Sequence, residues 1–238
     1  MSKTVNVIII LLFVAGLGVL LYPRVYGFAY KQQASKVISN FIEAFPEQET
    51  DPSHENTEEP GRIYPELYEA FAEYNKELAK GAQSSLNGNT AYQHFPVSLR
   101  DYGFADDLIG YITLPTVEME QPLYLGASDD NLKAGAAVMG YTSAPIGGEN
   151  TNCVIAGHNV WNGAKRFESI KKLKAGDAVV ITTFWGQRKY IVTHMAVIED
   201  NDIASIYIQT GKDMVTFMTC CYQNGVKMRY VVFCEFAE

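Results

Sequence analysis

The sequence predicts a mainly β fold, in which a closed eight-stranded barrel follows one apolar N-terminal helix and a helical arm. Three observations predict it: an uncharged apolar run opens the chain, residues 63–80 have helical periodicity, and short β-type runs alternate with turn signals from residue 108. A β-sandwich is the alternative for such strands. The expected parts are an anchor over 1–23, an arm with an acidic linker and a candidate lid loop over 24–107, and the β domain over 108–238.

The composition limits the class of protein. The chain has 238 residues, a formal net charge of -8 and 47% hydrophobic residues, which suits one globular domain with an appendage. The acidic balance, together with the lack of a basic stripe interleaved with aromatic residues, argues against nucleic-acid binding.

The opening segment is typical of a membrane anchor. From Val5 to Leu21 the only polar residue is Asn6, and this run would reach about 26 Å as a helix, close to the roughly 30 Å of a hydrocarbon core. Tyr22 is suited to the far interface. The alternative is a cleaved signal peptide with a small-x-small site at residues 27–29, but the run is long for one. Either reading sends the rest of the chain across a membrane.

The arm contains two helical patterns and two loops. Apolar residues late in the 25–45 segment are spaced like a helix face, and those of 63–80 recur every three or four residues. The 46–61 segment is acidic, contains three prolines and has no Lys or Arg, which indicates a solvated linker. The 81–104 segment is rich in Gly, Ser and Asn, and we expect a long loop that covers the cleft.

The β domain is predicted from about eight short runs. These include LIGYITLP, QPLYLG, AAVMGYT, TNCVIAGHN, DAVVITTF, RKYIVTHMAVI, DMVTFMTC and MRYVVFCEF. A helical turn is expected around residues 166–173, and no repeat of fixed period is visible.

Four cysteines raise the question of which one carries chemistry. Cys153 and Cys234 lie in runs that read as buried strands, where a free cysteine behaves as a small hydrophobe, and a bridge between them is the alternative. Cys220 and Cys221 are adjacent. Strand alternation places Cys221 on the face of Thr219 and places Cys220 on the opposite face, but it does not show which face is the cleft.

A reactive thiolate needs a base or cation nearby. Of the four histidines, His158 is the strongest candidate because it follows the strand CVIAG directly, where a sheet delivers a side chain to a surface cleft. His54, His94 and His194 read as a solvated linker residue, a loop residue and a strand residue. Arg229 opens a strand face shared with apolar residues, so it either lies at the rim or stabilises an oxyanion.

Together these residues resemble the sortases, membrane-anchored cysteine transpeptidases of Gram-positive surfaces. VIAGHN at 154–159, T-x-x-T-C at 216–220 and Arg229 occur in the family's order, with Phe217 in place of the usual leucine. The resemblance implies a sortase-type barrel with Cys220 as nucleophile, His158 and Arg229 as its catalytic partners and Thr219 in substrate binding. Cys221 lies where the family has a small or polar residue.

The resemblance is greatest to class C, the pilin-polymerising sortases. LLYPRV at 20–25, EYNKEL at 73–78, GYITLP and QPLYLGAS within 110–128, and the segment before His158 carry it. That class has a lid with Asp-Pro-aromatic, for which His94-Phe95 with the following proline is the nearest substitute. It also commonly has a second span after the β domain, whereas this sequence stops at Glu238. GHN is more like class B.

The resemblance implies cleavage of an LPxTG-like sorting signal between Thr and Gly through a thioacyl intermediate. An amine then resolves it, either a pilin lysine or a cell-wall peptide. The expected partners are surface proteins or pilins, the acceptor amine and the membrane, with the catalytic domain outside the cell. No cofactor or metal is expected, and no Cys/His cluster has zinc spacing. The alternatives are a wall-anchoring sortase of another class, a hydrolytic cysteine peptidase and a non-catalytic anchored β domain.

Overall fold

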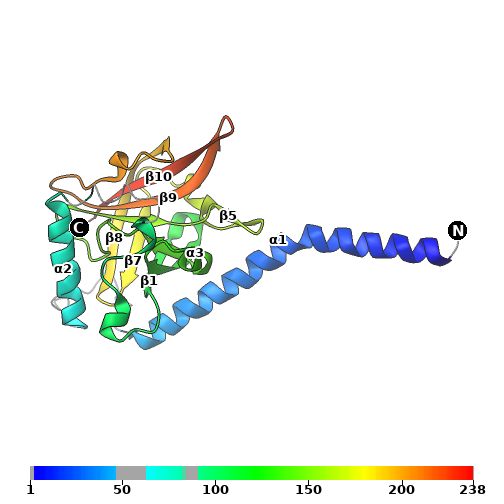
Figure 1. The fold of residues 1–238 in the computed structure, drawn as a ribbon, viewed down its shortest axis with the longest axis horizontal. Coiled ribbons are helices and arrows are strands. Elements are labelled where there is room, and N and C mark those ends of the chain that lie inside the picture. The colour runs from blue at the N-terminus through cyan, green and yellow to red at the C-terminus, as the bar shows by residue number, and fades with distance from the viewer. Residues whose placement is uncertain (1–2, 47–62, 82, 84–90, 238) are drawn as a thin grey trace.

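A closed eight-stranded barrel forms the body of the protein in the computed structural model, which describes residues 3–46, 63–81, 83 and 91–237 (Figure 1). The strand order is β1-β2-β3-β4-β9-β10-β8-β7, and the pairs β2–β3 and β4–β9 are parallel. The predicted mainly β barrel is therefore confirmed, and the sandwich is not formed. The strands are β1 Leu108–Leu114, β2 Met119–Leu125, β3 Ala136–Val138, β4 Thr151–Ala156, β7 Ala178–Thr183, β8 Gly186–Glu199, β9 Asp213–Gln223 and β10 Val226–Phe236.

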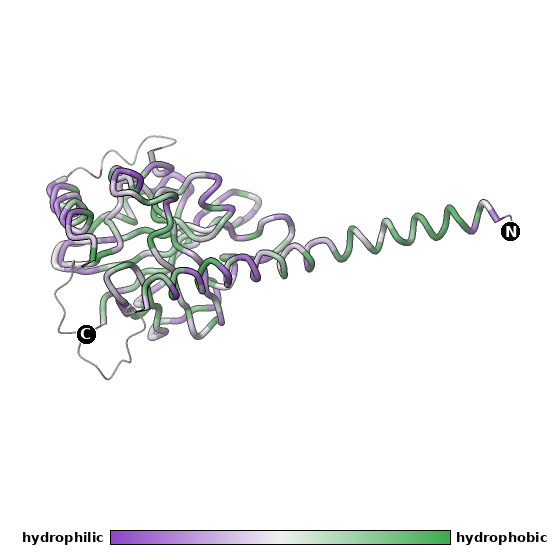
Figure 2. The backbone as a smooth tube through the Cα atoms, turned by 90° about the horizontal axis from the view of Figure 1, so that it is seen from below, coloured by the Kyte–Doolittle hydropathy of each residue, from purple (hydrophilic) through white to green (hydrophobic). Residues whose placement is uncertain are grey.

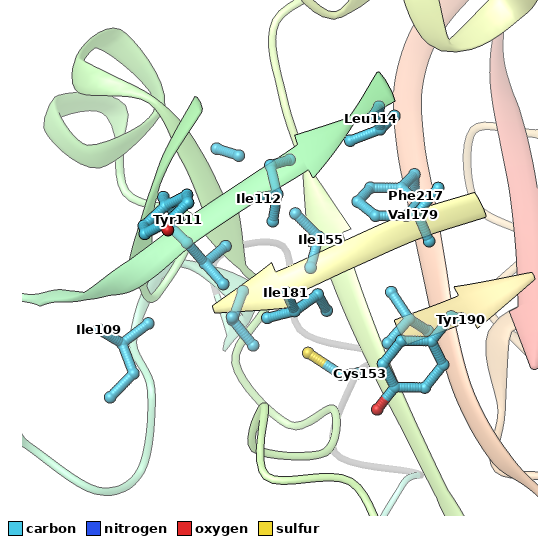
Figure 3. Packing of buried hydrophobic residues seen from close by; sticks show 14 of the residues in the cluster. Ile109, Tyr111, Ile112, Leu114, Cys153, Ile155, Val179, Ile181, Tyr190 and Phe217 are labelled. Atoms are coloured by element: carbon cyan, nitrogen blue, oxygen red, sulfur yellow. The ribbon is translucent and has the colours of Figure 1, made fainter. Parts of the chain in front are cut away.

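Strand alternation divides the apolar residues of the barrel into two clusters. The inner cluster fills the barrel, where Ile112, Ile155 and Ile181 come together from three strands (Figure 3). The outer cluster lies on the other face of the sheet and includes Met218 and Val231. Burial of both faces explains why β4 and β9 read as nearly continuous apolar runs rather than as alternating ones.

The N-terminal helix α1, Lys3–Ala44, runs without interruption from the apolar segment into the arm. Its apolar half projects from the barrel (Figures 1 and 2), and it is long and apolar enough to cross a membrane. Its second half packs on the barrel through four buried residues at helical spacing, Tyr30, Ala34, Ile38 and Phe41. Phe28, on the same part of the helix, is 66% exposed.

Helix α2, Pro65–Ala79, confirms the second helical pattern. Leu67, Phe71 and Leu78 are buried along one side, as their spacing predicts. Asn75, also buried, accepts a hydrogen bond from the backbone N–H of Ala144 at 2.7 Å and so satisfies a polar group inside this interface. The acidic linker lies almost entirely outside the described residues, as does His54.

Several short elements were not predicted. The turn after β2 contains the helix α3, Asp129–Ala134, whose first turn is capped by the Ser128 hydroxyl. After β4 comes a small hairpin of β5, Val160–Trp161, and β6, Ala164–Lys165. The expected helical turn is the 3-10 helix Phe167–Lys172. The two-residue strands of the hairpin and the six residues of α3 were missed because each is too short to show a clear periodicity.

Candidate active site

Cys220 and Arg229 face each other across two neighbouring strands. They are direct partners in the antiparallel β9–β10 ladder, so their side chains lie on the same face. Arg229 Nη1 donates a hydrogen bond to Cys220 Sγ at 2.9 Å. Cys220 therefore lies on the outer face of the sheet, together with Met218 and Val231. Alternation alone could not show which of the two faces of the strand holds the site.

The guanidinium of Arg229 is also held from its other side. Its Nε lies 2.5 Å from Asp200 Oδ1, and Asp200 Oδ2 accepts a hydrogen bond from Lys227 Nζ at 3.2 Å. A planar guanidinium with carboxylate and sulfur partners on different nitrogens has little freedom to turn. Asp200 was missed in the sequence because it is one acid among several in the segment after β8.

Replacing Asp200 with asparagine is expected to lower kcat/KM about tenfold, because the amide can still accept from Nε but no longer carries the charge that orients Arg229. The change should appear in kcat, measured with a peptide substrate. Asp202→Asn is the matched control, since Asp202 lies in the same loop but bonds to Ser205. Equal losses in both variants would assign the effect to the loop rather than to Arg229.

His158 is brought to the same end of the barrel by the parallel pairing of β4 and β9. Ala156 is opposite Met218, and the N–H of Gly157 donates to the carbonyl of Met218 at 3.1 Å. The hydroxyl of Thr219, which is buried, donates to the carbonyl of Gly157 at 2.8 Å. The strand that carries Cys220 is thus bonded to the residue before His158. In this structure the Thr219 side chain links the two, and its role in substrate binding stays a prediction.

The imidazole of His158 is half-buried and stacks on Trp161, with ring centroids 4.5 Å apart and planes at 19°. Burial lowers the pKa of His158, and the positive charges of Arg166 and Lys133 lower it further, while Asp129 acts in the opposite direction. The neutral imidazole is therefore favoured in the resting site. Trp161, like Asp200, had no signal in the sequence.

Gly157 leaves no room for a side chain between His158 and the barrel, because an added Cβ would lie 2.5 Å from the ring of Phe167. We expect Gly157→Ala to lower the free energy of unfolding by about 1–3 kcal/mol and to displace His158. Urea denaturation followed by fluorescence measures the first effect. Adding Phe167→Leu should recover part of the loss. Strict additivity of the two changes would contradict this contact.

Cys221 points away from Arg229, on the face of Phe217 and Thr219. Burial raises the pKa of its thiol, with Lys171 and Arg229 opposing that effect. Cys153 and Cys234 are buried and free, so they form no bridge in this structure. Of the two adjacent cysteines, Cys220 is the one with a cationic donor at hydrogen-bonding distance from its sulfur.

The segment proposed as a lid is described from residue 91 onward. Phe95 packs on α2, with its ring 5.8 Å from Phe71 and 5.1 Å from Tyr74. His94 is exposed. Tyr92 packs against the outer cluster, and its carbonyl accepts hydrogen bonds from the N–H groups of residues 127 and 140. The segment is thus fastened to the barrel, and a lid role for His94 and Phe95 stays a prediction.

Within the described ranges, no three His, Cys, Asp or Glu side chains gather in an arrangement that could hold a metal ion. The chemistry offered by the site is that of a thiol, an imidazole and a guanidinium at one end of a barrel. Such a set can form a thiolate nucleophile, transfer a proton and bind a developing oxyanion.

Comparison with known proteins identifies the family of the barrel domain. The family model for the Sortase domain matches residues 112–237. The chain is 30% identical over 125 residues to Sortase A of Bacillus anthracis, covering 52% of this chain and 58% of that protein. It is 29% identical over 126 residues to Sortase A of Listeria monocytogenes, covering 53% and 55%. The chain thus spans somewhat more than half the length of these curated relatives.

Solved structures extend the similarity beyond the barrel. Clostridium perfringens sortase C, crystallised with the C-terminal cell wall sorting motif, has a TM-score of 0.66 and 28% identity, covering 86% of this chain and 100% of that chain. Sortase C1 of GBS Pilus Island 1 has a TM-score of 0.64 and 25% identity, covering 83% and 90%. The likeness to class C that the sequence motifs predicted is confirmed.

Proposed function

The chain belongs to the sortase family, and from this premise we propose that it is a membrane-anchored cysteine transpeptidase acting on a C-terminal sorting signal. The observation that carries the proposal is the 2.9 Å contact between Arg229 Nη1 and Cys220 Sγ, at the barrel end where β4 delivers His158. A structural arginine at a strand end has no need of a cysteine partner, whereas a nucleophilic thiolate is stabilised by one.

In the proposed reaction, Cys220 attacks as thiolate at the Thr carbonyl of an LPxTG-like signal. A carbon–sulfur bond forms, and the developing oxyanion is stabilised by the guanidinium of Arg229. The Thr–Gly bond then breaks, and protonated His158 gives its proton to the leaving amine. The products of this half-reaction are a thioester on Cys220 and a free Gly amine.

The second half-reaction runs in the reverse sense. An acceptor amine attacks the thioester carbonyl, neutral His158 takes its proton, and the thiolate of Cys220 leaves as the new amide forms. Because burial lowers the pKa of His158, the imidazolium needed in the first step is a reduced population at neutral pH, while the base needed in the second is abundant.

The proposed anchor is the apolar half of α1. This helix continues unbroken through residues 27–29, the site that signal-peptide cleavage would use, and the residues that follow are packed on the barrel. These contacts support a retained anchor, and membership of the sortase family supports a catalytic domain at the outer surface of a Gram-positive cell.

The proposed substrates are surface proteins or pilins that bear an LPxTG-like signal. The similarity to sortase C crystallised with a sorting motif supports the signal, and that to the sortase of a pilus island supports pilins as substrates. The acceptor that the class C likeness implies is a pilin lysine. Attachment to cell-wall peptide is the alternative within the family, because the curated relatives are Sortase A proteins.

Intact-mass measurement of the full chain in detergent, mixed with an LPxTG peptide, tests the proposal. We expect an acyl adduct on the protein and, with hydroxylamine, a peptide hydroxamate ending at Thr. A hydrolytic cysteine peptidase would release the free acid at the same rate with or without an added amine. A non-catalytic domain would form no adduct with any sorting-signal peptide.

A further inference from the structure

The chain immediately after His158 forms a small hairpin that returns to the histidine through Arg166. The carbonyl of Asn159 accepts a hydrogen bond from the N–H of Arg166 at 3.0 Å, and the carbonyl of His158 accepts from the N–H of Phe167 at 2.9 Å. The backbone position of His158 therefore depends directly on where Arg166 and Phe167 lie.

The Arg166 side chain is a buried cation, only 7% exposed. Its Nη1 donates to the carbonyl of Lys133 at 2.6 Å, at the C-terminal end of α3. Its Nη2 donates to the hydroxyl of Tyr26 at 3.1 Å, and its Cζ lies 3.6 Å from the ring centre of Tyr30. A buried charge is stable only when it is paired or hydrogen-bonded in this way. Two of these partners belong to α1.

Helix α1 is seated closely on the same hairpin. A Cβ added to Gly163 would lie 2.9 Å from Pro23, and one added to Gly27 would lie 3.3 Å from Ala164. Gly163 also has a φ of +74°, which the turn between β5 and β6 requires and which favours glycine. The Tyr30 hydroxyl hydrogen-bonds to Gln121 of β2 as well, so α1, the barrel and the hairpin are tied together at one place.

We propose that Arg166 is a positioning residue for His158, and that two residues of α1, Tyr26 and Tyr30, complete the active-site scaffold by holding Arg166 in place. This inference rests on the proposed function of the site. In this proposal α1 helps to position the active site in addition to anchoring the protein in the membrane.

The charges around His158 provide an independent readout. Arg166 and Lys133 are the cations that lower the pKa of His158, and Asp129 opposes them. Releasing or removing the guanidinium of Arg166 should therefore raise that pKa. A substitution that keeps the charge of Arg166 but displaces its guanidinium should also raise that pKa, whereas one that only weakens the barrel should leave it unchanged.

The test uses the full chain in detergent, because a fragment beginning after Tyr30 would lack both tyrosines. Tyr30→Leu removes the ring under Arg166, and Tyr30→Phe keeps it. Phe28→Leu is the matched control, an aromatic residue on the same helix turn that is 66% exposed. Arg166→Met removes the charge itself. For each variant, kcat and KM are measured with an LPxTG peptide and an amine acceptor, and the titration of His158 is followed by NMR, assigned with His158→Gln.

We expect Tyr30→Leu and Arg166→Met to lower kcat roughly ten- to a hundredfold while KM changes less than about threefold, because a displaced catalytic group lowers the rate more than binding. The pKa of His158 should rise in both. Tyr30→Phe should keep most of the activity, and Phe28→Leu all of it. The proposal is overturned by equal losses in Tyr30→Leu and Phe28→Leu, by an unchanged kcat in Tyr30→Leu, or by an unmoved His158 titration in Arg166→Met.

This design separates the inference from the function on which it rests. A wild-type chain that forms no acyl adduct with the peptide refutes the proposed transpeptidase. The NMR titration needs no turnover, so it still decides whether α1 and Arg166 control the environment of His158.

Discussion

Replacing Cys220 with alanine is expected to abolish acyl-adduct formation and transpeptidation, a loss of at least about 10³-fold, because no thioacyl intermediate can form without its sulfur. Cys221→Ala should keep most of the activity. The neighbouring thiol points to the opposite face and its pKa is raised by burial, so it cannot replace the missing nucleophile. This is the largest effect we expect from any single substitution in the protein.

The two variants are compared by intact mass after incubation with an LPxTG peptide, and by hydroxamate yield with hydroxylamine. Alkylation with iodoacetamide provides a control that needs no substrate, since Cys220 should be modified faster than Cys221. Adduct formation that survives in Cys220→Ala and disappears in Cys221→Ala would contradict the pairing of Cys220 with Arg229. It would require the other face of β9 to be the catalytic one.

The adjacent cysteines show where the sequence stops predicting the site. Alternation correctly separated Cys220 from Cys221, but which face holds the cleft depends on how the barrel closes and on what covers its outer surface. That information lies in long-range pairing. The partner of Cys220 follows from the β9–β10 register, whereas the sequence showed only that Arg229 opens a strand face shared with apolar residues.

His158 was predicted from its position directly after an apolar strand, and the parallel pairing of β4 with β9 explains why that position matters. Asp200, Trp161 and Arg166 were not predicted. Each is an ordinary residue type in a turn or a very short element, and its contact in the structure is one that local periodicity cannot encode. The barrel itself was predictable because strands and turns alternate over more than a hundred residues.

The arm illustrates the same limit. Helical spacing correctly predicted a buried face late in the 25–45 segment, where Ile38 and Phe41 are buried, but it did not predict the contact that begins earlier in the helix. In the structure α1 meets the barrel along a line that begins at Pro23, Gly27 and Tyr30, where small residues allow close approach. Small and amphipathic residues give no apolar periodicity in the sequence. The contact between this part of α1 and the barrel could therefore be recognised only in the structure.

Replacing Arg229 with lysine is the second large expected effect. We expect kcat/KM to fall about 10²–10³-fold, the range observed when a donor to a developing oxyanion is removed. The positive charge is kept, but one ammonium group cannot bond Asp200 through one nitrogen and Cys220 through another, as the guanidinium does at 2.5 Å and 2.9 Å. The loss should therefore come from geometry rather than from charge.

Steady-state kinetics with a sorting-signal peptide measure this loss, and Arg229→Ala provides the comparison. If geometry decides, lysine and alanine should be almost equally poor, and KM should change little because the guanidinium acts on the reacting carbonyl. A midpoint of urea denaturation close to that of the wild type shows in each variant that the fold is intact. Near wild-type activity in Arg229→Lys would mean that the site needs only a cation beside Cys220. The carboxylate of Asp200 would then have no part in setting the rate.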